Sequence, residues 1–356
     1  MKKFQLLFTA VIAVALMASC GNAGKDKAAS NEKAKTITGA GATFPQPFYN
    51  KIFKSYTKEK GLLVTYGGIG SGGGIRSLKD KIVDFGASDA FLNDKKLADM
   101  PGEVLHVPTC LGAVVAAYNL PGKPELKFTP ELMEGVFMGK ITNWSDAKIA
   151  AVNPDVKLPD MEITVVYRSD GSGTTFIFSD YMSKVSAEWK EKIGAGKALK
   201  WPVGIGAKGN PGVAGTISQT EGAIGYIGSE YAFAMGIPVA SIQNKAGNFI
   251  HPSVESVSAS AKGEMPADTR VSLTNTDAVD GYPISSFTWL ILYKEQNYND
   301  RSADQAAQTI KLIEWVVSPE AQKETTKVHY APLPEAAVAK AKAVLDKVTY
   351  NGKALK

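Results

Sequence analysis

Three times in this chain an apolar, strand-like run leads into a loop of glycine with Ser or Thr, and then into a helix-like segment. These loops are residues 39–44 (GAGATF), 67–74 (GGIGSGGG) and 170–174 (DGSGT). A helix N-terminus presents unpaired backbone N–H groups, glycine lets the backbone approach a ligand closely, and a hydroxyl adds a donor without charge. Loops of this kind that meet at strand ends predict an α/β protein with a site for a small oxyanion.

Each loop taken alone also has simpler interpretations. Thr43, Ser71 and Ser172 are each placed to act as ordinary helix N-caps. Gly68, Gly70 and Gly73 fit the G-x-G-x-x-G pattern of dinucleotide-binding loops, with Asp89 following 21 residues after Gly68. A nucleotide-dependent oxidoreductase is therefore an alternative to the oxyanion site.

The length and the order of the predicted elements indicate two lobes. A chain of 356 residues exceeds one ordinary core. Helical patterns, such as residues 45–60 and 303–317, alternate with strand patterns, such as residues 62–66 and the apolar run at 110–118. We expect two α/β lobes with the ligand in the cleft between them.

The N-terminus predicts export. Residues 1–19 combine Lys2 and Lys3 with a short apolar run, as in a signal peptide, and the run is too short for a comfortable membrane span. The ending LMASC resembles a bacterial lipobox, which predicts lipid modification of Cys20. The alternatives are a simple cleaved signal with a chance cysteine, or an uncleaved anchor. Residues 20–35 are polar and aperiodic and predict a flexible tether at the cell envelope.

Composition excludes several other classes. The formal charge is +5, or +3 without the leader, and the basic residues are scattered, so we expect no nucleic-acid partner. Besides Cys20 the chain has only Cys110, in a strand-like run that predicts core packing. The three histidines show no metal-ligand spacing, so we expect no metal and no cofactor.

Two charged residues next to the loops shape the ligand hypothesis. Arg168 ends a strand and can bond an oxyanion bidentately, while the nearby Asp170 can hold it in place. Asp89 is unexpected beside an anion unless the ligand carries a proton, because a carboxylate only accepts hydrogen bonds. Phosphate near neutral pH has protonated oxygens and sulfate has none, so Asp89 predicts selectivity for phosphate.

At these residues the chain resembles the phosphate-binding proteins of bacterial high-affinity phosphate ABC transporters. The resemblance spans nearly the whole mature chain, in the family's order. Its motifs are GAGATFP (39–45), YGGIGSGGG (66–74), DFGASDA (84–90), RSDGSGTT (168–175), WPVGIGAKGN (201–210), GAIGYI (222–227) and YPISSFT (282–288).

The resemblance implies a two-lobed periplasmic-binding-protein fold, type II-like, that closes on phosphate. With it we expect lobe I at residues 36–117 plus 284–356 and lobe II at 118–283, with chain crossings near Tyr118 and Pro283. Implied ligands are Thr43, Phe44 through its N–H, Ser71, Asp89, Arg168, Ser172, Gly173 and Thr174, with Asp170 pairing Arg168. One departure is Gly72, where the family often has a second Ser.

The resemblance thus implies a receptor, not an enzyme. We expect a monomer that binds inorganic phosphate, delivers it to ABC permease subunits, and is attached to a membrane by its lipid anchor. The alternative is a secreted phosphate-ester hydrolase or another phosphate-recognising enzyme. Such an enzyme needs a nucleophile with a base, or metal ligands. No histidine lies in the glycine–hydroxyl loops.

Overall fold

The computed structural model describes residue 34 and residues 36–355. The predicted signal peptide, the lipid site at Cys20 and nearly all of the predicted tether lie outside the described residues. Within the part of the chain that is described, no helix is long and apolar enough to cross a membrane.

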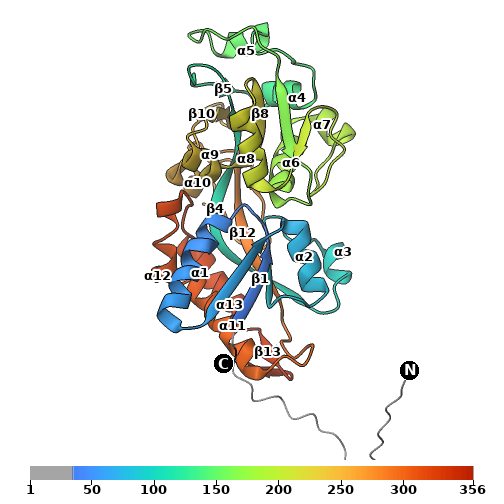
Figure 1. Ribbon diagram of the computed structural model, residues 1–356, viewed down its shortest axis with the longest axis vertical. Coiled ribbons are helices and arrows are strands. Elements are labelled where there is room, and N and C mark those ends of the chain that lie inside the picture. Colours follow the sequence, from blue (N-terminus) through green and yellow to red (C-terminus); the bar gives the residue numbers. More distant parts are fainter. Residues whose placement is uncertain (1–33, 35, 356) are drawn as a thin grey trace, which may run out of the picture.

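Two α/β lobes follow one another along the long axis of the molecule (Figure 1). Strand β4 (Val104–Tyr118) links them, and all of its fifteen residues are buried. Its first part pairs antiparallel with β12 (Ile284–Tyr293), and Val114 to Tyr118 pair antiparallel with β8 (Ala223–Gly228). The expected two-lobed α/β architecture is confirmed.

The main sheet has the strand order β2-β1-β3-β12-β4-β8-β6-β7, with β11 paired to β12. In lobe I, β1 runs parallel to both β2 and β3; in lobe II, β6 runs parallel to both β7 and β8. Ligand sites in open α/β sheets form at the carboxyl ends of such strands. The remaining strands of this sheet are β1 (Thr36–Gly41), β2 (Leu63–Gly68), β3 (Phe85–Ser88), β6 (Thr164–Arg168), β7 (Ile205–Ala207) and β11 (Leu273–Thr274).

Helices cover the sheet in both lobes (Figure 1). In lobe I they are α1 (Gln46–Lys60), α2 (Ser71–Lys79), α3 (Asp94–Ala98), α11 (Ala303–Val316), α12 (Pro319–Gln322), η1 (Thr326–Val328) and α13 (Glu335–Leu345). The others are α4 (Pro130–Phe137), α5 (Ala147–Val152), α6 (Gly173–Val185), α7 (Ala187–Lys192), α8 (Gly209–Gln219), α9 (Ser229–Met235) and α10 (Val254–Ala259). Two small sheets complete the fold: β5 (Lys127–Phe128) with β9 (Ser241–Gln243) and β10 (Phe249–Ile250), and β13 (Thr349–Tyr350) with β14 (Lys353–Ala354).

Helix α1 illustrates how pattern becomes structure. Its predicted apolar face is buried, including Phe48 and Ile52. Gly61 ends the helix in the left-handed conformation, with φ of 70°, and donates its N–H to the carbonyl of Thr57. Cys110 is fully buried in β4, as expected of a core residue.

Helix α2 begins earlier than the sequence predicts. The sequence of residues 75–81 predicts a short helix that starts at Ile75, but α2 starts at Ser71 and takes in Gly72 to Gly74. The lack of space around Gly74 explains why this position needs glycine. A Cβ would lie 2.5 Å from the Cα of Gly41 and 2.7 Å from the carbonyl oxygen of Ala40. The glycines therefore let the first turn of α2 lie directly against β1.

Candidate functional site

The carboxyl ends of the strands bring the predicted residues together where the lobes meet. Thr43 follows β1, Ser71 follows β2 and Asp89 follows β3 on the lobe I side. Arg168 ends β6 on the lobe II side, and the loop after it runs into α6. Contacts across this junction are close, since Gly72 donates its N–H to the carbonyl of Gly171 at 2.8 Å. The structure is therefore a closed arrangement of the two lobes.

Ser71 is the centre of the contacts on the lobe I side. Its hydroxyl is fully buried and accepts hydrogen bonds from the N–H groups of Asp89 at 3.2 Å and Gly173 at 3.1 Å. Residue 173 must be glycine, because a Cβ there would collide with Ser71 Oγ and Asp89 Oδ2. The N-cap interpretation is wrong for Ser71, since Gly70 occupies that position and no side chain caps α2.

Asp89 is 2 % exposed and makes two hydroxyl contacts. Thr288 donates to Oδ1 at 2.7 Å, and Ser71 lies 3.3 Å from Oδ2. Burial raises the pKa of Asp89 to about 7, although the bond from Thr288 and the positive charge of Arg168 both oppose the rise. The carboxyl group is thus poised to exchange a proton near neutral pH.

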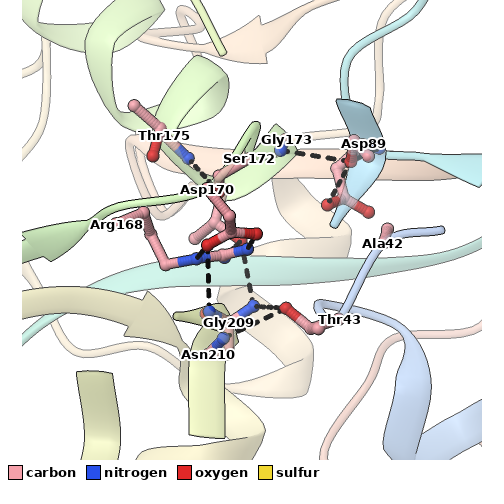
Figure 2. A network of polar contacts seen from close by, with 12 residues as sticks. Ala42, Thr43, Asp89, Arg168, Asp170, Ser172, Gly173, Thr175, Gly209 and Asn210 are labelled. Carbon is pink, nitrogen blue, oxygen red and sulfur yellow. Dashed lines mark hydrogen bonds and ion pairs between the residues drawn. The ribbon is translucent and has the colours of Figure 1, made fainter. Parts of the chain in front are cut away.

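Arg168 and Asp170 form a two-point ion pair (Figure 2). Nε and Nη2 of Arg168 donate to the two carboxylate oxygens of Asp170 at 2.7 and 2.6 Å, and the arginine side chain is 1 % exposed. Burial pushes the pKa of Asp170 upward, but the hydrogen bonds and charge of Arg168, with the N–H of Gly209, outweigh it and lower the pKa. Nη1 of Arg168 remains directed to the hydroxyl of Thr174 at 3.3 Å.

The loop before α6 combines capping with close packing. Ser172 is the N-cap of α6 and accepts the N–H of Thr175 at 3.0 Å, so the N-cap interpretation is confirmed for this residue. Ser172, Gly173 and Thr174 are all buried at the positive end of the helix. The first turn of α6 therefore presents its donors to the junction between the lobes.

Thr43 and Phe44 enter the site at the start of α1. The Thr43 hydroxyl accepts bonds from the backbone and side-chain nitrogens of Asn210, drawn in Figure 2. Pro45 is the N-cap of α1 and no side chain caps it, so the N-cap interpretation is wrong for Thr43. The carbonyl of Phe44 accepts from the hydroxyl of Tyr330 at 2.5 Å, and its ring packs edge-on against that tyrosine.

Sequence reasoning missed several buried partners. Thr288 and Asn210 lie inside the motifs YPISSFT and WPVGIGAKGN, and that position is their only signal. Tyr226 accepts the N–H of Arg168 at 3.0 Å, and Tyr231 donates to the carbonyl of Thr43 at 2.5 Å. Burial raises the pKa of Glu230, at the start of α9, well above its usual value. Such contacts join distant segments and have no local pattern.

The described residues contain no group of three or more His, Cys, Asp or Glu side chains arranged to hold a metal ion. His106 is buried, and burial lowers its pKa to about 3. Its Nε2 accepts the N–H of Leu92 at 3.0 Å, which makes it a neutral structural residue. His251 and His329 are exposed.

Comparisons with known proteins agree with this architecture. A family model described as a PBP superfamily domain matches residues 26–320. The phosphate-binding protein PstS of Pasteurella multocida is 40 % identical over 316 residues, covering 87 % of this chain and 90 % of the relative. The protein of the same name from Haemophilus influenzae is 41 % identical over 309 residues, covering 85 % and 90 %.

A solved structure with bound phosphate supports the fold. It is a putative phosphate ABC transporter substrate-binding protein from Clostridium perfringens, with a TM-score of 0.61 and 18 % identity. The alignment covers 84 % of this chain and all of the Clostridium chain.

Proposed function

The chain belongs to the PstS family of phosphate-binding proteins within the PBP superfamily, and from this premise we propose that it binds inorganic phosphate outside the cytoplasm for a phosphate ABC permease. The observation that supports this most is the composition of the buried junction between the lobes. Hydroxyls, helix N-terminal N–H groups and one guanidinium lie around the buried carboxyl group of Asp89.

The proposed phosphate ligands all belong to this junction. Asp89 accepts the phosphate proton, while Asp170 holds the guanidinium of Arg168 in place from the side. The proposed ligand residues are Thr43, Phe44 through its N–H, Ser71, Asp89, Arg168, Ser172, Gly173 and Thr174.

Hydrogen bonds, not net charge, supply most of the attraction in this proposal. Arg168 is already neutralised by Asp170 at 2.6 Å. Donors buried away from water bind an anion more strongly than exposed ones, and the N-terminus of α6 adds a partial positive charge. The site is therefore suited to an oxyanion that keeps one proton for Asp89.

Closure of the two lobes would sequester the anion and mark the loaded form for the permease. We propose lobe I as residues 36–117 plus 284–356 and lobe II as residues 118–283. In the structure β4 changes its pairing partner between Ala113 and Val114, a few residues before that boundary.

We also propose that the protein is an exported monomer and not an enzyme. Its relatives are named as binding proteins, and the buried hydroxyls contact N–H groups and carboxylates instead of a histidine base. The signal peptide would direct export, and the lipid on Cys20 would anchor the protein at the cell envelope. Mass spectrometry of the membrane fraction tests the anchor, and a Cys20→Ser variant should release the protein.

Titration calorimetry of refolded, phosphate-stripped protein tests the function. We expect tight binding of inorganic phosphate and no release of phosphate from a monoester such as glucose 6-phosphate. Monoester turnover would support the hydrolase instead, and the absence of heat with inorganic phosphate would refute the receptor.

A further inference from the structure

Asn210 is a fully buried residue that joins the two lobes beside the proposed phosphate ligands. It is the second residue of α8, after Gly209, whose φ of +70° requires glycine. This turn directs the N–H of Gly209 to Asp170 at 2.9 Å and the N–H of Asn210 to the Thr43 hydroxyl at 3.1 Å. Figure 2 shows the side chain of Asn210 directed at Thr43 as well.

The orientation of the Asn210 amide follows from its partners. Its Oδ1 accepts the N–H of Gly228 at 3.0 Å, and a backbone N–H can only donate. The NH₂ group must therefore face the other way. It donates to the hydroxyl oxygens of Thr43 and Thr174, both at 3.0 Å.

These bonds use up the acceptor capacity of both hydroxyls. Thr43 Oγ1 accepts from the backbone and side-chain nitrogens of Asn210, and Thr174 Oγ1 accepts from Asn210 and from Nη1 of Arg168 at 3.3 Å. A hydroxyl has two lone pairs and one proton, so each group has only its proton left to offer. Ser71 also has both lone pairs occupied, by the backbone N–H groups of Asp89 and Gly173, but its own proton is directed to Oδ2 of Asp89 at 3.3 Å.

We propose that Asn210 is a positioning residue that makes the Thr43 and Thr174 hydroxyls obligate donors toward the bound anion. This inference rests on the proposed phosphate function and deepens it. A phosphate oxygen that carries a proton finds no acceptor at these two hydroxyls and must turn to Asp89. Asn210 thus helps to determine which phosphate oxygen carries the proton, although Asn210 itself does not contact the ligand.

The arrangement is complete only when the lobes meet. Thr43 follows β1 of lobe I, whereas Asn210 and Thr174 follow β7 and β6 of lobe II. An open form separates Asn210 from Thr43 and frees the lone pairs of that hydroxyl. Closure therefore makes the Thr43 hydroxyl a donor only, in the same movement that encloses the ligand.

The isosteric variant Asn210→Asp keeps the shape of the side chain but replaces its hydrogen-bond donors with acceptors. Its carboxylate keeps an acceptor for the N–H of Gly228 but can only accept from Thr43 and Thr174, which turns their protons away from the ligand. Calorimetry at about pH 8 should show phosphate affinity reduced on the order of a hundredfold. Partial recovery at about pH 5 is expected, where the introduced carboxyl group takes up a proton and can donate again. Wild-type affinity at both pH values would overturn the proposal.

A second variant, Asn210→Ala, removes the amide donors without adding a charge. It frees one lone pair on each of the two hydroxyls, so phosphate binding should weaken about tenfold at pH 8 and less at pH 5, where the ligand carries a second proton. Unchanged affinity, or an equal loss at both pH values, would overturn the proposal. Arg168, Asp170, Asp89 and Glu230 are the charged or acidic groups around this cluster, and each variant is compared with wild type at the same pH so that their titration cancels.

Two controls keep the outcomes distinct. Ser218→Ala, at the exposed end of α8, should bind as wild type does. Melting curves without phosphate check folding, and if Asn210→Ala fails to fold, the pH profile of Asn210→Asp decides. Absence of phosphate binding by the wild-type protein would instead refute the proposed function itself.

Discussion

Two carboxyl groups, one buried and one half-buried, lie within the same junction and behave in opposite ways. Asp89, after β3 in lobe I, receives bonds from hydroxyls, and burial raises its pKa to about 7. Asp170, after β6 in lobe II, is paired with Arg168 through two short bonds, which lower its pKa. Asp170 is therefore committed to the arginine, whereas we propose that Asp89 faces the bound phosphate.

The difference shows that partners, not residue type, assign the role of a carboxyl group. A guanidinium at 2.6 Å stabilises the charged form of Asp170, whereas burial disfavours the charged form of Asp89 even though hydroxyls donate to it. An anion site can hold two acidic residues on these terms: Asp170 is neutralised by its arginine, and in the proposed complex Asp89 shares a proton with phosphate.

Among the variants of these residues, removal of Arg168 should weaken phosphate binding most. Arg168→Ala leaves Asp170 as an uncompensated charge facing the anion. Loss of one partner of a charge pair at a binding site costs about 2–5 kcal/mol, so phosphate affinity should fall by roughly 30- to 4,000-fold in calorimetry. The double variant Arg168→Ala/Asp170→Asn is the matched control and should regain part of the loss. Equal affinity of the single variant and wild type would contradict the role of Arg168.

Asp89→Asn should weaken phosphate binding less and change its selectivity. Loss of one charge-assisted hydrogen bond costs about 1.5–3 kcal/mol, or roughly 10–100-fold in the phosphate dissociation constant. The amide can donate to a bare oxygen, so sulfate should become a detectable ligand. Competition of sulfate with phosphate measures this directly, and unchanged selectivity would count against the role of Asp89.

The two carboxyl groups should also affect stability in opposite directions with pH. Folded Asp89 keeps its proton to about pH 7, while the unfolded group loses it near its usual value of 3.8. The folded state binds the extra proton between these values, so the free energy of unfolding falls as pH rises from about 4 to 7. Asp170, with its lowered pKa, adds stability above its usual value that is lost as pH falls through the folded pKa.

Phosphate-free melting curves check this contrast. Between about pH 4 and 7 the melting temperature of Asp89→Asn should decline less than that of wild type. The difference corresponds to a change in unfolding free energy on the order of a few kcal/mol. Glu230, which also has a raised pKa, is present in both proteins and cancels in the comparison. Parallel pH profiles of variant and wild type would argue that Asp89 keeps its usual pKa.

Asp170→Asn should have the smallest effect on binding. The amide oxygen can still accept from Arg168, and the lost negative charge favours the anion, so we expect phosphate affinity within about tenfold of wild type. Salt should weaken binding more in the variant, because the freed arginine charge is then screened. Calorimetry over a salt series measures both, and a loss as large as that of Arg168→Ala would contradict this account.

The sequence predicts this fold well because its signals are local. The apolar face of α1, its Gly61 end and the buried strand before Tyr118 are each set by nearby residues. The start of α2 is predicted too late because a run of glycines has low helix propensity, and only its packing against β1 makes a helix possible there.

The sequence predicts the site as a set of loops, but not its network. Loop chemistry places Ser71, Asp89 and Arg168 near one another, and the structure brings them together. Asn210 and Thr288 are missed because each acts on a hydroxyl or carboxyl group far away in the chain. A lone Asn or Thr has no periodicity or spacing that reports such a contact.

The discrimination of phosphate from sulfate by the wild-type protein tests the central claim most directly. A site in which Asp89 needs a ligand proton should reject an anion without one by on the order of 10⁴-fold or more. Calorimetric titration of phosphate-stripped protein with each anion, near neutral pH, should therefore give tight binding of phosphate and no measurable binding of sulfate. Equal affinity for the two anions would contradict the assignment of Asp89 as the acceptor of the phosphate proton.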